Sequence, residues 1–414
     1  MTATSTDDAL GSTLMTLRGF QWVYGARQDP YALLLRAESD DPHELGRRVR
    51  ANGALTWSSA EAWVTATHAL AVRLLRDERL GLRKPPPTDS APSWAMPTLD
   101  DVLPLDDVGL QLDRTDCERF GRSVAAALAA PRLEKAHTEI TVRIDRLAAG
   151  LNGTFDLTSD YAVPVATMAT SVLLGVPAAH QEEFARLCAG AATALDATLC
   201  PPRLDTARLL LDSIAGLREL LVSLPTGAGD DLLGELTRTE PDSVLPVALL
   251  HCAVGADLTA TLIANTMCAL LAEPGRWTAV ATDPGLAAAA VRETLRFAPP
   301  VRLQRLVART DLDLDGTAIT AGSEVVVLLE AANRDPAAFA DPDHFDPGRE
   351  PAAEILWAHP AMPAGVVAET VRRHATVAVS ALAAHLPTLR AAGEGYRRLR
   401  SPVTGSPLSR PVVA

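Results

Sequence analysis

Cysteine and histidine are among the side chains that bind transition metals or take part in nucleophilic catalysis. No two of its five cysteines have the CxxC spacing, so reduced and mostly buried thiols of a cytosolic protein are the plainest interpretation. His251 and Cys252 are neighbours in a predicted helix, where their side chains point about 100° apart and cannot share a metal ion. Glycine-rich phosphate-binding, GxSxG and HExxH motifs are absent from the sequence. The sequence therefore predicts neither catalytic residues nor a metal site.

A glutamate and an arginine, Glu293 and Arg296, share one face of a predicted helix and can form an ion pair. Alone, such a pair is most often a solvated surface pair. Its surroundings are more specific, because a proline-terminated helix end, short predicted strands, an NRDP segment at 333–336 and an FDP segment at 345–347 follow in order. This order and spacing over residues 286–349 resembles the C-terminal half of bacterial cytochromes P450, in which the ExxR pair belongs to the K helix.

The resemblance draws attention to a missing iron ligand. A cytochrome P450 holds its haem iron with a cysteine thiolate in a loop after this segment, yet no cysteine follows Cys268. Counting back from the C-terminal part places Gly365 near the ligand position. His359 and Met362 are the nearby side chains that could bind iron, since both types are axial ligands in other haem proteins. A lone histidine beside a proline is more often an ordinary loop residue.

Other positions at which the resemblance implies haem chemistry also carry unsuitable residues. Cys117 and Gly121 stand where P450s carry the histidine and arginine that hold the haem propionates. Leu258 replaces the threonine that delivers protons to iron-bound dioxygen together with an acid; the acid position holds Asp257, which we expect to pair locally in its helix. His344 stands where we expect the last arginine of the P450 Glu-Arg-Arg triad. These losses together predict that no haem is bound, and that side chains or shifted helices close the former haem pocket, because an empty cavity costs stability.

Helices dominate the elements that must position these residues. Apolar periodicity predicts helices over 204–224, 246–271, 286–297 and 366–385, and the second is apolar nearly all round and therefore buried. Residues around Asp315–Gly316 and in 325–329 read as short strands. We therefore expect a mainly α fold with small β-sheets, P450-like but lacking the cysteine-ligand haem loop, in one domain over residues 1–414. Its parts would be an N-terminal segment 1–58, a central helix 244–272, the ExxR-to-FDP region 286–349, and a degenerate ligand loop, helix and tail over 350–414.

The charge of the chain limits its partners, and its apolar patterning indicates its location. Its formal net charge is −13, which argues against nucleic acid or an anionic membrane as the main partner. The polar start lacks the basic and apolar regions of a signal peptide. Polar residues interrupt the apolar stretch 244–271, so a buried helix fits it better than a membrane span. We expect a cytoplasmic protein.

Both ends of the chain add a narrower resemblance. The run RGFQWVYG at 18–25, the Asp29-Pro30-Tyr31 segment, the His359-Pro360-Ala361 loop and the tail 397–412 are similar to haem-less, P450-like auxiliary proteins of antibiotic glycosyltransferases. This resemblance implies a non-catalytic activator that stabilises a nucleotide-deoxysugar-dependent glycosyltransferase of macrolide or anthracycline biosynthesis, and a heterotetramer of the two proteins. Trp22, Tyr24, Asp29 and Tyr31 are candidates for the partner interface. Packing of the N-terminal segment onto the core is the alternative for the three aromatic residues.

Two other functions stay open on the sequence alone. A haem-binding P450-type oxidoreductase with a non-cysteine ligand such as His359 would show a Soret absorption band. A protein that binds a hydrophobic aglycone would bind polyketides without a partner protein.

Overall fold

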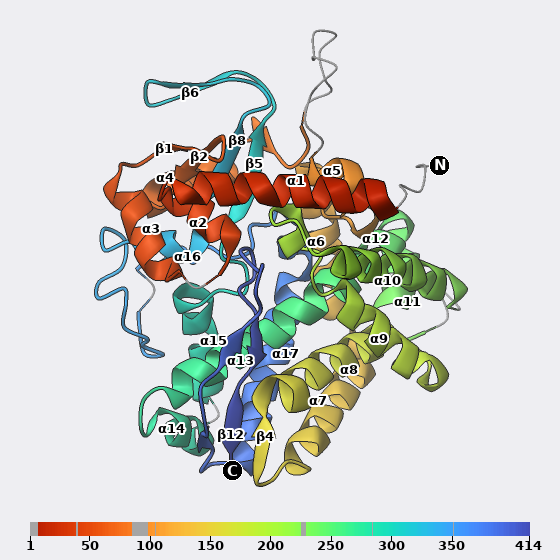
Figure 1. The fold of residues 1–414 in the computed structure, drawn as a ribbon. Coiled ribbons are helices and arrows are strands. Elements are labelled where there is room, and N and C mark those ends of the chain that lie inside the picture. The colour runs from red at the N-terminus through yellow and green to blue at the C-terminus, as the bar shows by residue number, and fades with distance from the viewer. Residues whose placement is uncertain are drawn as a thin grey trace.

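The computed structural model describes residues 7–38, 40–84, 98–103, 105–224, 229–283, 285–350 and 352–414. Helices form most of this part of the chain, and Figure 1 shows the larger sheet beside α1 at the top and the strands β4 and β12 at the bottom. The α-helices are α1 (Asp7–Ala26), α2 (Pro30–Arg36), α3 (Pro42–Ala51), α4 (His68–Arg76), α5 (Leu99–Val102), α6 (Arg114–Leu128), α7 (Glu134–Ala149), α8 (Val163–Leu173), α9 (Gln181–Ala191), α10 (Leu204–Ser223), α11 (Leu232–Thr239), α12 (Val244–Leu250), α13 (Ala256–Leu271), α14 (Arg276–Thr282), α15 (Gly285–Phe297), α16 (Leu329–Ala332) and α17 (Pro363–His385).

The strands form small sheets that join distant parts of the chain. One sheet has the order β1 (Thr56–Ser58), β2 (Ala62–Thr65), β8 (Glu324–Val327), β5 (Gln304–Ala308) and β3 (Leu80–Gly81). In it β2 and β8 are parallel and the other neighbours are antiparallel. The remaining strands are β4 (Thr154–Asp156), β12 (Pro411–Val413) and β9 (Arg390–Ala391) in one sheet, and the pairs β6 (Leu312–Leu314) with β7 (Thr317–Ile319) and β10 (Tyr396–Arg397) with β11 (Pro407–Ser409).

The predicted central helix is buried, but it is not uniform. A π-helical turn, His251–Gly255, separates α12 from α13. The His251 ring is fully buried there, with Nδ1 2.8 Å from the Val247 carbonyl and Nε2 3.2 Å from Thr370 Oγ1. The stretch Pro241–Leu271 is long and apolar enough to cross a membrane, but the fold buries its most apolar 18-residue window completely. Its apolar surface is therefore explained by packing against helices such as α8, α15 and α17.

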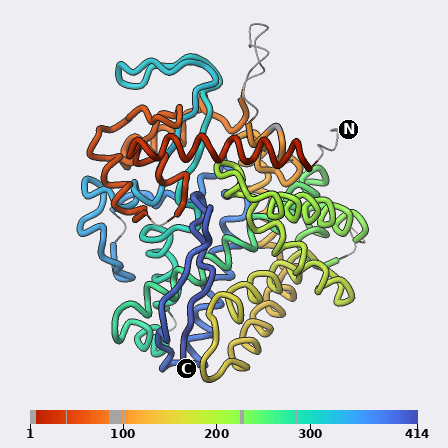
Figure 2. Tube along the Cα trace, viewed as in Figure 1, coloured from red at the N-terminus to blue at the C-terminus, as the bar shows by residue number. Residues whose placement is uncertain are grey.

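The C-terminal tail enters the body of the molecule. Figures 1 and 2 show it as a ribbon that runs over α13 towards the C-terminus at the bottom. Residues 401–406 are all buried although four of them are polar or glycine. Strand β12 ends the tail between β4 and β9. A buried polar segment needs hydrogen-bond partners in the core, and these partners prove to be aspartates.

Candidate functional site

The Glu293–Arg296 pair lies in the core, as the resemblance implied. Arg296 is fully buried on α15, and its Nε and Nη2 donate to the two Glu293 carboxylate oxygens at 3.0 and 2.7 Å. Its Nη1 also donates to the carbonyls of Asn333 and Pro342 at 3.1 and 2.8 Å. Removing one partner of such a pair would leave an uncompensated buried charge. The pair therefore holds the loop after α16 in place and has no free group for catalysis.

The prediction that the triad lost its last arginine at His344 is wrong. Arg349 completes it, because its Nε donates to Glu293 Oε1 at 3.2 Å. The His344 carbonyl accepts hydrogen bonds from both arginines, at 3.0 Å from Arg296 and 3.1 Å from Arg349. The sequence pattern did not indicate this arginine, because it follows the FDP segment by two residues, whereas the resemblance to P450s places the third member directly before Phe345. The structural part of the P450 scaffold is thus intact.

The ligand position has no room for a side chain. Gly365 lies at the start of α17, and a Cβ atom there would stand 2.3 Å from the His359 carbonyl oxygen and 2.9 Å from Pro360 Cα. Both neighbours are backbone atoms, which cannot move aside as the end of a flexible side chain can. Met362 N–H donates to the same His359 carbonyl at 2.9 Å, which fixes the turn. A cysteine at this position would not fit the present loop.

The alternative ligand His359 is engaged within the same turn. Its Nδ1 accepts the Ala361 N–H at 3.2 Å. Burial, and next the charge of Arg114, lower the pKa of His359. The cavity that His359 and Met362 line has a volume of only ≈ 20 Å³. The loop therefore presents no histidine to a cofactor-sized space.

The other degenerate positions are packed rather than open. Gly121 on α6 faces the start of α17, where an added Cβ would lie 3.8 Å from the Gly365 carbonyl oxygen. Cys117 is fully buried one turn earlier, and burial raises the pKa of its thiol to about 12, so it is not the thiolate that binds iron. Leu258 is fully buried in α13. These residues supply no ligand, propionate anchor or proton relay, and they do not fit a haem.

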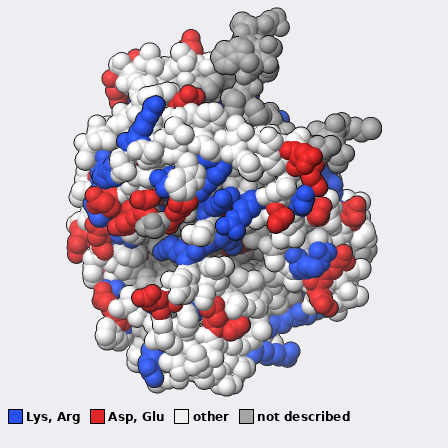
Figure 3. Space-filling model, in the orientation of Figure 1, with Lys and Arg blue, Asp and Glu red and all other residues white. Residues whose placement is uncertain are grey.

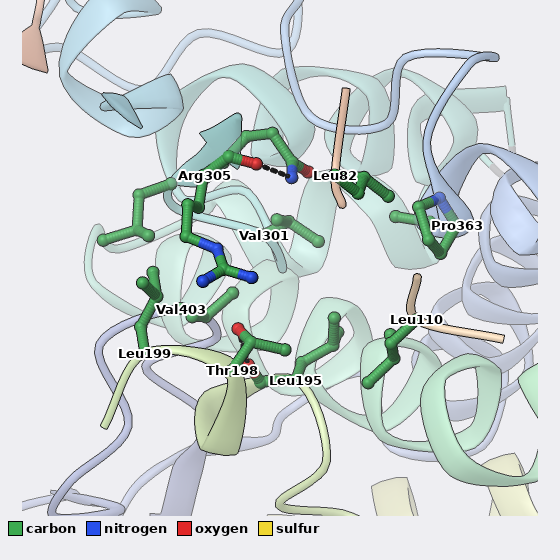
Figure 4. Close-up of a pocket in the computed structure, with 12 residues that line it drawn as sticks. Leu82, Leu110, Leu195, Thr198, Leu199, Val301, Arg305, Pro363 and Val403 are labelled. Atoms are coloured by element: carbon green, nitrogen blue, oxygen red, sulfur yellow. Dashed lines mark hydrogen bonds between the residues drawn. The ribbon is translucent and has the colours of Figure 1, made fainter. Parts of the chain in front are cut away.

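A cavity of ≈ 50 Å³ lies beside the ligand loop and is lined by Pro363 and Ala364. Pockets for small molecules usually have roughly 300–1,000 Å³, so this one holds little more than water. Figure 4 shows that Arg305 points into it, towards Thr198 and Val403. Burial lowers the pKa of the Arg305 guanidinium, but the carboxylates of Glu324 and Asp100 outweigh this and raise it. A charged arginine and the tail thus occupy this space.

Asp257, at the acid position of the central helix, does not pair locally as predicted. Its Oδ1 accepts from Arg398 Nη2 at 2.9 Å, and its Oδ2 accepts from Ser406 Oγ at 3.3 Å. Both partners belong to the C-terminal tail. Thr259, the next hydroxyl, donates to the Gly255 carbonyl of its own helix at 2.7 Å. The acid therefore fastens the tail and is not free to relay protons.

A second aspartate that the sequence did not single out binds the turn of the tail. Asp196 is 2% exposed. One of its oxygens accepts the backbone N–H groups of Val403 and Thr404 at 2.9 and 3.0 Å, and the other accepts the hydroxyls of Ser401 and Thr404 at 2.7 and 2.9 Å. No local pattern marks this residue, because its partners lie more than 200 positions further along the chain.

A third aspartate holds the last part of the tail. Asp156 accepts the Ser409 hydroxyl and, at 2.8 Å, the Arg410 N–H. Asp156, Asp196 and Asp257, which we call the tail-binding aspartates, come from three separate elements. Together they fix the tail against the core along its length.

The four N-terminal candidates occupy different environments. Tyr31 is 2% exposed, so packing, the alternative interpretation, holds for it. Asp29 caps α2 by accepting the Ala32 N–H at 3.0 Å, and it also accepts the Ser58 hydroxyl at 2.9 Å. Trp22 is 46% exposed under the guanidinium of Arg36, and Tyr24 is half-buried against Phe20. Of the four, Trp22 presents the most surface to a partner.

Comparison with known proteins indicates the same P450-like scaffold. Residues 285–350 match the family model described as "Cytochrome P450". Protein AknT of Streptomyces galilaeus is 43% identical over 98% of this chain and 96% of its own length, and Protein DesVIII of Streptomyces venezuelae is 37% identical over 98% and 94%. The crystal structure of Mycobacterium smegmatis CYP164A2 with econazole bound superposes with a TM-score of 0.74 at 28% identity, covering 93% of this chain and 99% of that one. The predicted mainly α, P450-like fold is confirmed.

Proposed function

Because this chain belongs to the family of P450-like auxiliary proteins of antibiotic glycosyltransferases, we propose that it works without haem and without catalysis. In this role it binds the transferase of its pathway and stabilises the transferase's folded, active state. The transferase would be one that uses a nucleotide deoxysugar to modify a macrolide or anthracycline polyketide.

The enclosed ligand position carries this proposal. Gly365 has backbone atoms within 3 Å of any added Cβ, and a P450 without a thiolate at this place has no iron chemistry. The buried Glu293–Arg296–Arg349 triad also supports it, because it is a structural part of the scaffold that is retained. Groups that stabilise the scaffold are kept, whereas groups that would serve an iron are replaced.

A helper of this kind needs no reactive group. It changes an equilibrium only by its different affinity for two states of the transferase, and a partner that binds the folded state alone stabilises it by mass action. The helper must then present a surface of adequate size, since lasting complexes bury more than roughly 1,000 Å² in total. We propose a cytoplasmic heterotetramer built on a dimeric transferase.

Two measurements test the proposal. The chain is expressed with haem available, and its visible spectrum is recorded. The transferase encoded in the same gene cluster is then expressed with and without it, and sugar transfer is assayed. We expect no Soret band, co-purification of the two proteins, and loss of transferase activity when the chain is omitted. Stoichiometric haem would instead favour an oxidoreductase, and full transferase activity without the chain would refute the activator role.

A further inference from the structure

Three large apolar side chains are exposed on one short hairpin of the tail. Tyr396, Leu399 and Leu408 are 60%, 66% and 59% exposed, on or beside the paired strands β10 and β11. Single exposed apolar residues are ordinary on protein surfaces. Three on a hairpin of this length, next to a cleft, are typical of a surface that a partner covers.

The same place carries positive charge on a chain that is negative overall. Leu399 and Leu408 line a cleft of ≈ 570 Å³ together with Arg203 and Arg400. Arg203 is exposed, and its guanidinium makes no ion pair or hydrogen bond within the described residues. Figure 3 shows arginine and lysine side chains in a band across this face, beside a hollow. The net charge of the chain is −13, so a patch of positive charge differs from the rest of the surface. It would attract a negatively charged partner to this face.

The neighbouring Arg400 has no carboxylate partner among the described residues. The Arg400 side chain donates to the Pro201 carbonyl at 3.5 Å, and burial, followed by the nearby charge of Arg18, lowers its pKa. Glu38 lies in the same cleft but pairs with Arg18 and Arg36. The surface thus has cationic groups available to an incoming carboxylate.

The tail-binding aspartates make this surface rigid. Asp257 binds Arg398, Asp196 binds the turn 401–404, and Asp156 binds the end of β11. A surface that is ordered before binding loses less conformational entropy in a complex. Tyrosine and arginine are also the residue types that most often dominate interface energies.

We propose that Tyr396, Leu399, Leu408, Arg203 and Arg400 form a docking surface for an acidic, amphipathic segment of the glycosyltransferase. Carboxylates of that segment pair with the two arginines, and its apolar side chains fill the cleft between the two leucines. The assignment rests on the proposed function, because it names the surface through which the helper holds its partner. It commits to an acidic segment because charge complementarity favours one over a neutral or basic segment.

Matched variants test the surface in the full-length protein. Arg203→Glu and Leu399→Asp change two exposed groups of the cleft. Arg390→Glu, on the exposed strand β9, and Val222→Asp, at the far end of α10, are the controls, since Val222 is 66% exposed like Leu399. Circular dichroism serves to check that all four variants fold. Binding to the transferase of the same gene cluster is measured by calorimetry at increasing sodium chloride.

Each cleft variant should weaken binding by at least ~10-fold, as interface hot spots do, whereas the controls should bind like the wild type. Salt should weaken wild-type binding more than binding of Arg203→Glu, because one ion pair is already lost. If the wild type binds and the cleft variants bind equally well, the proposed docking surface is wrong and the proposed function stands. Wild type that does not bind overturns both. Self-association of the chain that Leu399→Asp abolishes would make the occupant a second copy and also overturn the assignment.

Discussion

Replacing Asp196 by alanine should release the turn of the C-terminal tail. The carboxylate accepts two backbone N–H groups, from Val403 and Thr404, and two hydroxyls, and it is 2% exposed. After the substitution the hydroxyls can rotate towards other acceptors, but the two N–H groups cannot. They would remain buried without partners.

The expected cost follows from those two groups. A buried donor left unsatisfied costs about 1–3 kcal/mol, so Asp196→Ala should lose about 2–6 kcal/mol of the free energy of unfolding. Asp196→Asn should cost much less. Burial raises the pKa of Asp196, so the uncharged amide resembles the state that burial favours, its oxygen can accept both N–H groups, and its NH₂ can donate to the hydroxyls.

Urea denaturation followed by circular dichroism measures the loss, and hydrogen exchange of residues 401–406 localises it. Exchange of this segment should accelerate strongly in the alanine variant and little in the asparagine variant. Equal stability of Asp196→Ala and wild type would show that the tail is not held by this residue. Equal losses in the two variants would mean that charge, and not hydrogen bonding, makes the contact.

Three further outcomes are expected. Arg349→Ala should lower the free energy of unfolding by about 2–3 kcal/mol, because the buried carboxylate keeps only one of its two arginines; an unchanged urea midpoint would deny Arg349 its place in the triad. Burial lowers the pKa of His251 to about 4 and that of His374 to about 3, below the ordinary value of about 6.5. As the pH falls below about 6.5, these histidines take up protons in the unfolded chain before they do so in the folded chain. The free energy of unfolding should therefore be full at neutral pH and decline towards pH 4, with a loss of about 2 kcal/mol per ring at pH 5. Urea midpoints that do not change between pH 7 and 5 would contradict this. Gly365→Cys should destabilise the protein and give no Soret band, because the new Cβ would lie 2.3 Å from the His359 carbonyl oxygen; stoichiometric haem in this variant would refute the packing argument.

The helices were largely predictable because their periodicity is local. The predicted spans 204–224 and 286–297 agree with α10 (Leu204–Ser223) and α15 (Gly285–Phe297). The last long helix begins at Pro363 and not at 366, since proline is favoured in the first turn of a helix and the prediction started from the first apolar residue. The π-helical turn after Leu250 left no mark in the apolar pattern, because every residue there is buried.

Contacts between distant segments could not be predicted from the sequence. Strand β2 pairs with β8 in parallel, Asp257 pairs with Arg398, and Asp196 binds Thr404. Each contact joins residues far apart in the chain, so no spacing rule connects them. The Glu293–Arg296 pair was predicted because its spacing is that of one helix turn. Arg349, the third member of the triad, could not be predicted in this way, because its contact with Glu293 depends on how the loop returns to the helix.

The tail-binding aspartates also impose an order on biosynthesis. Their partners lie between Arg398 and Arg410, and a chain is made and folded from its N-terminus onwards. Before residues 398–410 have been made, α13 and the segment around Asp196 are complete but their carboxylates lack the tail groups that they bind. The final packing must therefore wait until residues 398–410 have been made, and a nascent chain that still lacks them leaves the three aspartates without these partners.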